Sequence, residues 1–192
     1  NSYLNQAGLD SIKRLPNLTW IDATKAYYYS FDQKNNCVNL NLLDIDANNI
    51  KKVTSVPSNA ENHTITLPSL KVAYTIENNL YFADGDRQVQ VTDNPENVVA
   101  GQSVHRNEFA INGGIFWSPD GNKLAYYNMD ESMVTDYPLV DVTERVATAK
   151  PIKYPMAGMK SHEVKLHVYD VASGNDLIVK TGEPAEQYLT SI

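Results

Sequence analysis

Apolar and polar residues alternate along much of this chain with a period of two, which is the period of a half-buried β-strand. No long apolar stripe with the 3.6-residue period of a helix accompanies this alternation. A turn followed by an alternating strand with tyrosine near its end recurs at intervals of about 48 residues. The three copies lie at residues 18–29, 67–76 and 116–127. The pattern therefore predicts a mainly antiparallel β structure with little helix.

A repeat of this length, built from strand signals, is typical of a four-stranded propeller blade. The third copy has the sharpest turn, at residues 117–121, where proline fixes φ, aspartate caps its own backbone and glycine supplies a positive φ. We therefore expect an all-β fold, a partial β-propeller of antiparallel four-stranded blades. About three blades of a larger propeller would be present. Since propellers close with at least four blades, we expect the chain to be a fragment.

The repeat also predicts how the chain is divided. All of residues 1–192 are assigned to the propeller fragment, in units that cover about 9–60, 61–94 and 109–182. An inserted arm over about 131–162 interrupts the third unit, because this proline-punctuated stretch is too long for a hairpin loop.

Charge and cysteine content exclude several classes of function. The chain has 16 Lys and Arg against 23 Asp and Glu, a net charge of −7, and no basic stripe interleaved with aromatic residues. Nucleic acid is therefore not an expected partner. No apolar run is long enough to span a bilayer. The single Cys37 has no second cysteine with which to form a disulfide or a thiolate metal cluster, and is interpreted as a small buried apolar residue.

Motifs that carry a complete catalytic apparatus do not occur in the sequence. There is no Gly-x-Ser-x-Gly elbow, His-Glu-x-x-His pair, phosphate-binding loop or dinucleotide fingerprint, so we assign no catalytic residue, no metal site and no cofactor. The histidines have no serine or cysteine partner by spacing; they are His63, His105, His162 and His167. Six aspartates lie at expected turns, where Asp caps its own backbone: Asp44, Asp46, Asp84, Asp86, Asp120 and Asp170. Glu108 differs from these aspartates in its position, since it does not lie at an expected turn but follows Arg106 in a segment between two units.

Four stretches together resemble the amino-terminal propeller of the dipeptidyl peptidase IV family of serine peptidases, which are of the prolyl oligopeptidase type. They lie at residues 105–109, 116–126, 129–134 and 153–158. The resemblance runs from about residue 102 to 182, with a weaker match over 9–94. It is closest to the bacterial prolyl tripeptidyl and dipeptidyl peptidases.

The resemblance implies an eight-bladed propeller fused to an α/β-hydrolase domain that supplies the serine, aspartate and histidine. The parent enzyme would be a serine exopeptidase that releases di- or tripeptides from the amino terminus of peptides, commonly after proline. The fragment would supply substrate access and recognition of the terminal amine, and alone is expected to be inactive. Its implied partners are the peptide substrate and the missing hydrolase domain, and its implied compartment is the periplasm or another exported location.

Within the family, one or two propeller glutamates before the Trp-Ser-Pro turn hold the free α-amino group of the substrate. The resemblance assigns this role to Glu108, with Arg106 either orienting Glu108 or meeting a substrate carbonyl. Dipeptidyl members often show consecutive glutamates there, whereas this chain has Arg106-Asn107-Glu108. In having a single glutamate, this segment looks more like that of a bacterial prolyl tripeptidyl peptidase.

Two other classes of function stay open beside the exopeptidase. A non-catalytic propeller scaffold would have no hydrolase domain downstream, and a propeller glycosidase would bring carboxylates from different blades to one sugar. Blade faces left uncovered would favour self-association, so a homodimer is also among the expected partners.

Overall fold

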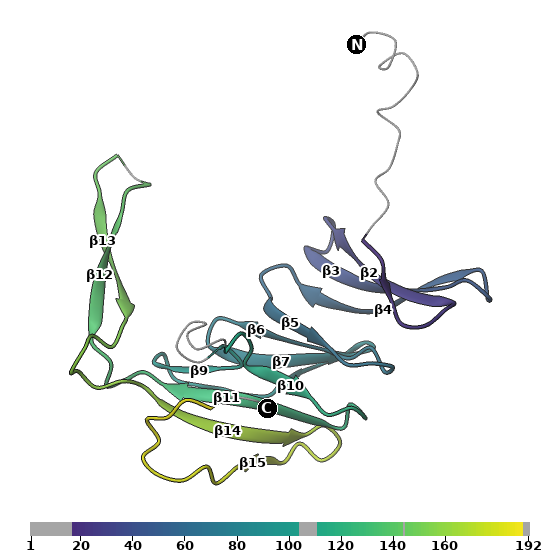
Figure 1. Ribbon diagram of the computed structural model, residues 1–192. Helices are drawn as coiled ribbons and strands as arrows, with labels where there is room; N and C mark the ends of the chain where they lie inside the picture. The colour runs from purple at the N-terminus through teal and green to yellow at the C-terminus, as the bar shows by residue number, and fades with distance from the viewer. Residues whose placement is uncertain (1–16, 104–110, 144, 190–192) are drawn as a thin grey trace. The chain divides into compact units, whose positions relative to one another are not determined.

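The computed structural model describes residues 17–103, 111–143 and 145–189. These residues form fifteen β-strands and no helix (Figure 1). Every strand pair among them is antiparallel. None of the described segments is a helix that is long and apolar enough to cross a membrane. The expected all-β class is therefore confirmed.

The chain divides into two compact units, one up to Ser58 and one from Asn59 onward. The first unit is a four-stranded sheet in the order β1-β2-β3-β4. Its strands are β1 (Thr19–Trp20), β2 (Lys25–Asp32), β3 (Cys37–Asp44) and β4 (Asn49–Pro57). Among its apolar residues from position 17 onward, only Ala26, Leu40 and Val56 are buried. The sheet thus follows the period-two pattern without enclosing a large core of its own.

The second unit contains three sheets. The first has the order β5-β6-β7-β8, with β5 (Glu61–Ile65), β6 (Val72–Ile76), β7 (Asn79–Asp84) and β8 (Arg87–Gln90). The second has the order β10-β11-β14-β15, with β10 (Ile115–Trp117), β11 (Lys123–Asp130), β14 (Glu163–Asp170) and β15 (Asp176–Ile178). The short β9 (Val98–Ala100) also pairs with β11. The third sheet is the pair β12 (Asp136–Asp141) and β13 (Thr148–Lys153).

The two larger sheets of the second unit lie face to face over one core, as Figure 1 shows. Leu80 and Phe82 of the first sheet pack with Leu124 and Tyr126 of the second, and all four are at most 1% exposed. The Phe82 ring meets Trp117 edge-on, with ring centroids 6.1 Å apart. Burial of this apolar and aromatic surface from both sheets is the main stabilising contribution to the unit.

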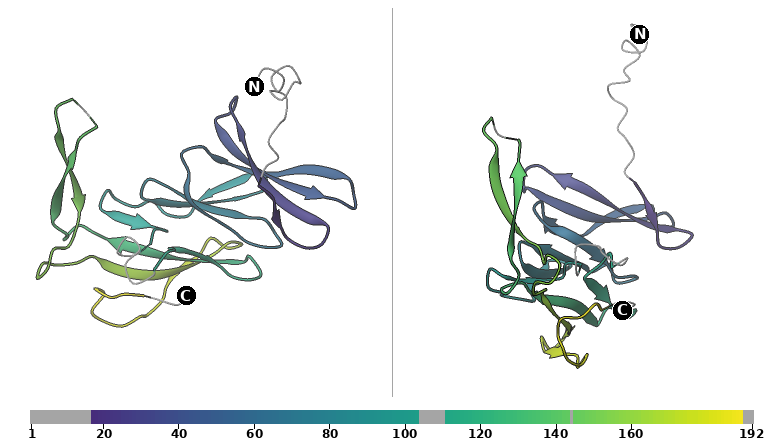
Figure 2. Two further views of the ribbon diagram at one scale, coloured as in Figure 1. Left: turned by 45° about the horizontal axis from the view of Figure 1, so that its top comes forward. Right: turned by 60° about the vertical axis from the view of Figure 1, so that its left-hand side comes forward.

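The strands β12 and β13 form a separate hairpin, drawn as a narrow two-stranded ribbon in Figure 2. Its register runs from Asp136 opposite Lys153 to Asp141 opposite Thr148. The hairpin lies within the residues expected for the inserted arm. The boundaries of the predicted units and of that arm stay predictions.

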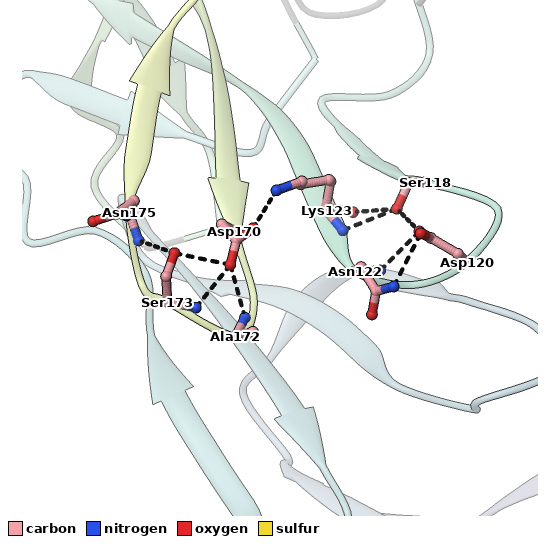
Figure 3. A network of polar contacts seen from close by, with 8 residues as sticks. All are labelled: Ser118, Asp120, Asn122, Lys123, Asp170, Ala172, Ser173 and Asn175. Carbon is pink, nitrogen blue, oxygen red and sulfur yellow. Dashed lines mark hydrogen bonds and ion pairs between the residues drawn. The ribbon is translucent and has the colours of Figure 1, made fainter.

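The turn between β10 and β11 is held by its own side chains (Figure 3). The Ser118 hydroxyl donates to Asp120 Oδ1 over 2.6 Å and accepts the Lys123 N–H over 2.9 Å. Asp120 Oδ1 also accepts the Asn122 N–H over 3.0 Å. These contacts, that from Ser118 first, hold the pKa of Asp120 below its ordinary value. The interpretation of Asp120 as a turn residue is confirmed.

Asp170 caps the neighbouring turn between β14 and β15 in the same way (Figure 3). Its Oδ1 accepts the Ser173 N–H over 2.7 Å and the Ala172 N–H over 3.1 Å, and its Oδ2 is ion-paired with Lys123. The hydrogen bond from Lys123, followed by those from Ser173, holds the pKa of Asp170 well below 3.8. Lys123 lies opposite Asp170 in the ladder, so the ion pair joins the two turns.

We expect Asp170→Asn to lower the melting temperature of the chain at neutral pH, because it removes the charge that Lys123 and the turn amides stabilise. The folded-state pKa is depressed, so this stabilisation is present above the unfolded-state pKa and is lost as the pH falls through the folded-state pKa. The difference in melting temperature between wild type and variant should therefore shrink progressively below about pH 4. Thermal unfolding followed across this range measures it.

Asp46→Asn is the matched control, since Asp46 is exposed and has no hydrogen bond or ion pair within the described residues. Its melting temperature should follow that of the wild type at each pH. A difference for Asp170→Asn that is constant across the acid range would show that the carboxylate charge is not the stabilising group.

Candidate functional site

The second unit contains a polar cavity of about 730 Å³. It lies where five parts of the two larger sheets meet: the start of β5, the turn between β6 and β7, the end of β9, the start of β10 and the end of β11. Its volume is in the range of small-molecule and peptide sites. Its polar wall is formed chiefly by Asn62, His63, Asn78, Gln102, Asn112 and Glu131.

A tight turn places Asn78 in this wall. Ile76 pairs with Asn79, which leaves Glu77 and Asn78 as a two-residue hairpin loop, and Glu77 has a φ of +53°. A left-handed residue at this position is typical of the turns that match the twist of a hairpin. The Asn78 carbonyl also accepts the Ala100 N–H over 2.9 Å, which ties the turn to β9.

The backbone of Tyr127 in β11 holds two more cavity segments. The Gly101 N–H donates to the Tyr127 carbonyl over 2.8 Å, and the Tyr127 N–H donates to the Gly114 carbonyl over 3.0 Å. A β-carbon at position 114 would overlap the backbone of Gln102, so only glycine allows this approach. The chain on both sides of residues 104–110 is thus fixed at one residue of β11.

The side-chain amides of the wall have a fixed orientation. The Gln102 Nε2 donates to the Glu77 carbonyl over 3.2 Å, and the Asn78 Nδ2 donates to the Glu96 carbonyl. A backbone carbonyl only accepts hydrogen bonds, so the nitrogen of each amide must face its partner. The Asn62 Nδ2 donates to Thr75 Oγ1 over 2.9 Å.

Since the amide nitrogens bind these partners, these hydrogen bonds do not use the amide oxygens of the same side chains. In the part of the chain that the structure describes, no donor reaches Asn62 Oδ1, Asn78 Oδ1 or Gln102 Oε1. The wall therefore includes three amide oxygens that can accept hydrogen bonds.

Among the described residues that line the cavity, Glu131 carries a carboxylate and none is Lys or Arg. Burial lowers the pKa of His63 below 6.5, so its ring is neutral at neutral pH. The floor is apolar, since Val99, Ile115 and Met129 also line the cavity and are each at most 7% exposed. The cavity combines an apolar floor with an acceptor-rich wall.

The two residues that sequence analysis singled out, Arg106 and Glu108, lie outside the described residues, as does His105. Ser103 and Asn112 flank that segment and both line the cavity.

The remaining histidines take other places in the second unit. His63 lies in the cavity wall, whereas His167 is buried in β14, with its Nδ1 2.7 Å from Asp176 Oδ2. His162 is also buried, at the start of the same strand region. Within the described ranges, no three His, Cys, Asp or Glu side chains come together as a metal site.

Sequence reasoning missed the amide wall. Asn62, Asn78 and Gln102 look like ordinary polar residues of turns, and their contacts join segments 13 to 25 residues apart. The available signal was the glycine spacing: Gly101 on one side of the Glu108 segment and Gly113-Gly114 on the other indicate close backbone approach.

We expect Gly114→Ala to destabilise the chain by about 1–3 kcal/mol, the cost of forcing extra volume into packed structure, because the new methyl group would overlap the Gln102 backbone. Gly113→Ala is the matched control, since a β-carbon there lies 3.8 Å from Phe116 Cε1, an ordinary contact. Urea unfolding of both variants measures the free energies. Equal effects of the two changes would contradict the close approach.

Comparison with known proteins gives one matching family model, that of the dipeptidyl peptidase IV (DPP IV) N-terminal region, over residues 15–192. Among curated proteins, a probable dipeptidyl-aminopeptidase B of Podospora anserina is 33% identical over 127 residues, which are 57% of this chain and 14% of that protein. Its counterpart in Neurospora crassa is 32% identical over 122 residues, which are 54% of this chain and 13% of that protein.

Two solved structures are also similar. A putative dipeptidyl aminopeptidase IV from Bacteroides ovatus has a TM-score of 0.74 and 39% identity, and the match covers 96% of this chain and 25% of that one. Porphyromonas gingivalis dipeptidyl peptidase 4 has a TM-score of 0.62 and 24% identity, covering 85% of this chain and 25% of that one, and supports the fold alone. The chain thus spans a small part of the length of the proteins it matches.

Proposed function

This chain belongs to the family of dipeptidyl peptidase IV N-terminal regions, and on that premise we propose that it is the propeller part of a serine exopeptidase. The full-length protein would release di- or tripeptides from the amino terminus of peptides, with cleavage after proline. The observation that carries this proposal is the family match, which extends over residues 15–192. The names of the fungal and bacterial relatives, dipeptidyl aminopeptidases, support the release of dipeptides.

In this proposal the chemical step belongs to another part of the full-length protein. The 192 residues contain no Gly-x-Ser-x-Gly elbow, and an acyl-transfer reaction needs a nucleophile, its base and oxyanion donors. A hydrolase domain would supply them. This chain would supply the wall along which the substrate enters and the groups that recognise its free amine.

Glu108 is the proposed recognition residue. A protonated α-amino group is a compact cation with three donors, and a carboxylate binds it by charge-assisted hydrogen bonds. Support comes from the chain path, since Ser103 and Asn112 on either side of the Glu108 segment line an acceptor-rich cavity. Arg106 would orient Glu108 or meet a substrate carbonyl.

An anchor of this kind determines the length of the product. If the carboxylate is held at a fixed distance from the nucleophile, only a bond a set number of residues from the free amine reaches the nucleophile. The single glutamate in Arg106-Asn107-Glu108 resembles tripeptidyl members, whereas the names of the relatives favour dipeptides, so the proposal covers release of either. Export to the periplasm and assembly as a homodimer are further parts of the proposal.

We expect Glu108→Gln in the full-length enzyme to lower kcat/KM for peptides with a free amino terminus by about 1.5–3 kcal/mol, the range for a hydrogen bond to a charged group. The change keeps the shape of the side chain and removes its charge. Steady-state kinetics with prolyl peptide substrates measures the effect. Substrates with a blocked amino terminus should be far less affected.

Glu163→Gln is the control, since Glu163 is an exposed residue at the start of β14 and does not line the cavity. It should leave kcat/KM unchanged for both kinds of substrate. If Glu108→Gln in a correctly folded enzyme also leaves kcat/KM unchanged for free amino-terminal peptides, the anchor is another residue. A full-length protein without a hydrolase domain would instead indicate a binding scaffold.

A further inference from the structure

The side-chain amides of the cavity wall offer hydrogen-bond acceptors to a ligand. Gln102 and Asn78 direct their nitrogens to backbone carbonyls of Glu77 and Glu96, so their oxygens are left to bind whatever enters. A ligand that brings donors can bind these oxygens. A positively charged donor makes stronger hydrogen bonds with such oxygens than a neutral donor does.

The apolar floor restricts the guest further. Val99, Ile115 and Met129 line the same cavity and are largely buried. A small ammonium group would leave this floor uncovered. A long aliphatic stem that ends in a cation would cover it, because Lys and Arg side chains lay their methylene groups on apolar surface and keep the charged head at polar groups.

We propose that this cavity receives the protonated side chain of a Lys or Arg residue near the amino end of the peptide. The stem packs on Val99, Ile115 and Met129, and the charged head donates to the amide oxygens of Asn62, Asn78 and Gln102. The inference rests on the proposed function in taking a peptide as the ligand. It adds a specificity site that uses uncharged amides and is separate from the proposed anchor at Glu108.

The protonation state of His63 at neutral pH is compatible with a cation bound in this cavity. Its pKa is lowered by burial, so at neutral pH the ring adds no positive charge beside the bound cation. Protonation of His63 in acid would place a like charge in the same wall.

The test compares short peptides that end in proline, as the proposed products do, and that differ only in charge. Ala-Lys-Pro and Lys-Pro are paired with Ala-norleucine-Pro and norleucine-Pro, because norleucine keeps the aliphatic stem and lacks the ammonium group. Isothermal titration of the full-length protein measures affinity. At least one lysine peptide should bind about tenfold more tightly than its norleucine partner, as expected for hydrogen bonds to a charged group.

Gln102→Met removes the acceptor at similar side-chain length and should abolish most of this difference, with little effect on the norleucine peptides. Gln90→Met is the matched control, since Gln90 also donates its amide to a backbone carbonyl, that of Thr92, over 2.8 Å but does not line the cavity. It should preserve the preference for lysine.

Gln102→Lys separates the binding role from a structural one. The ammonium group can still donate to the Glu77 carbonyl, yet it adds a positive charge to the wall, so it should weaken binding of the lysine peptides selectively. Equal binding of lysine and norleucine peptides by the unmodified protein would overturn the proposal. So would an equal loss for both peptides in Gln102→Met, which would place the α-amino group at this wall.

Glu108→Gln in the same titration tests the proposed function independently. If this change weakens the binding of all peptides with a free amine while the lysine preference is absent, only the proposed lysine site is wrong. If the lysine preference is present and Glu108→Gln has no effect on peptide affinity, the proposed role of Glu108 is wrong and the lysine site is supported.

Discussion

Face-to-face packing of the two larger sheets of the second unit is the interaction on which the rest of this structure depends. A four-stranded sheet buries one face only against a neighbour, and here Phe82 of β7 and Trp117 of β10 meet across the boundary. The Trp117 Nε1–H also donates to the Thr64 carbonyl of β5 over 3.3 Å. The cavity lies where the edges of the same two sheets meet, so its geometry is a consequence of this packing.

The polarity of the cavity is linked to hydrogen bonds between its amides and the backbone. Gln102 donates to the carbonyl of Glu77, and Asn78 donates to the carbonyl of Glu96. These hydrogen bonds use one N–H of each amide, and no donor reaches the amide oxygens within the described residues. In this partial β-propeller the hydrogen bonds that stabilise the scaffold also determine what kind of ligand the scaffold can bind.

Much of the fold was predictable from local sequence, and most of the site was not. Period-two alternation and the turns capped by Asp120 and Asp170 depend on neighbours in sequence, and both were predicted correctly. The family resemblance was carried by short motifs and is confirmed. The amide wall depends on contacts such as that between Gln102 and Glu77, which only the tertiary fold brings together. The roles of Glu108 and Arg106 stay predictions.

A double-mutant cycle on Phe82 and Trp117 tests the central claim, that the two sheets share one core. The changes Phe82→Leu and Trp117→Leu are made singly and together in the chain, and urea unfolding gives the free energy of each variant. A shared core predicts that the effects are not additive, with a coupling of about 0.5–1.5 kcal/mol for an aromatic pair in contact. Effects that add within error would show that the two sheets do not pack through this pair, and would contradict the account.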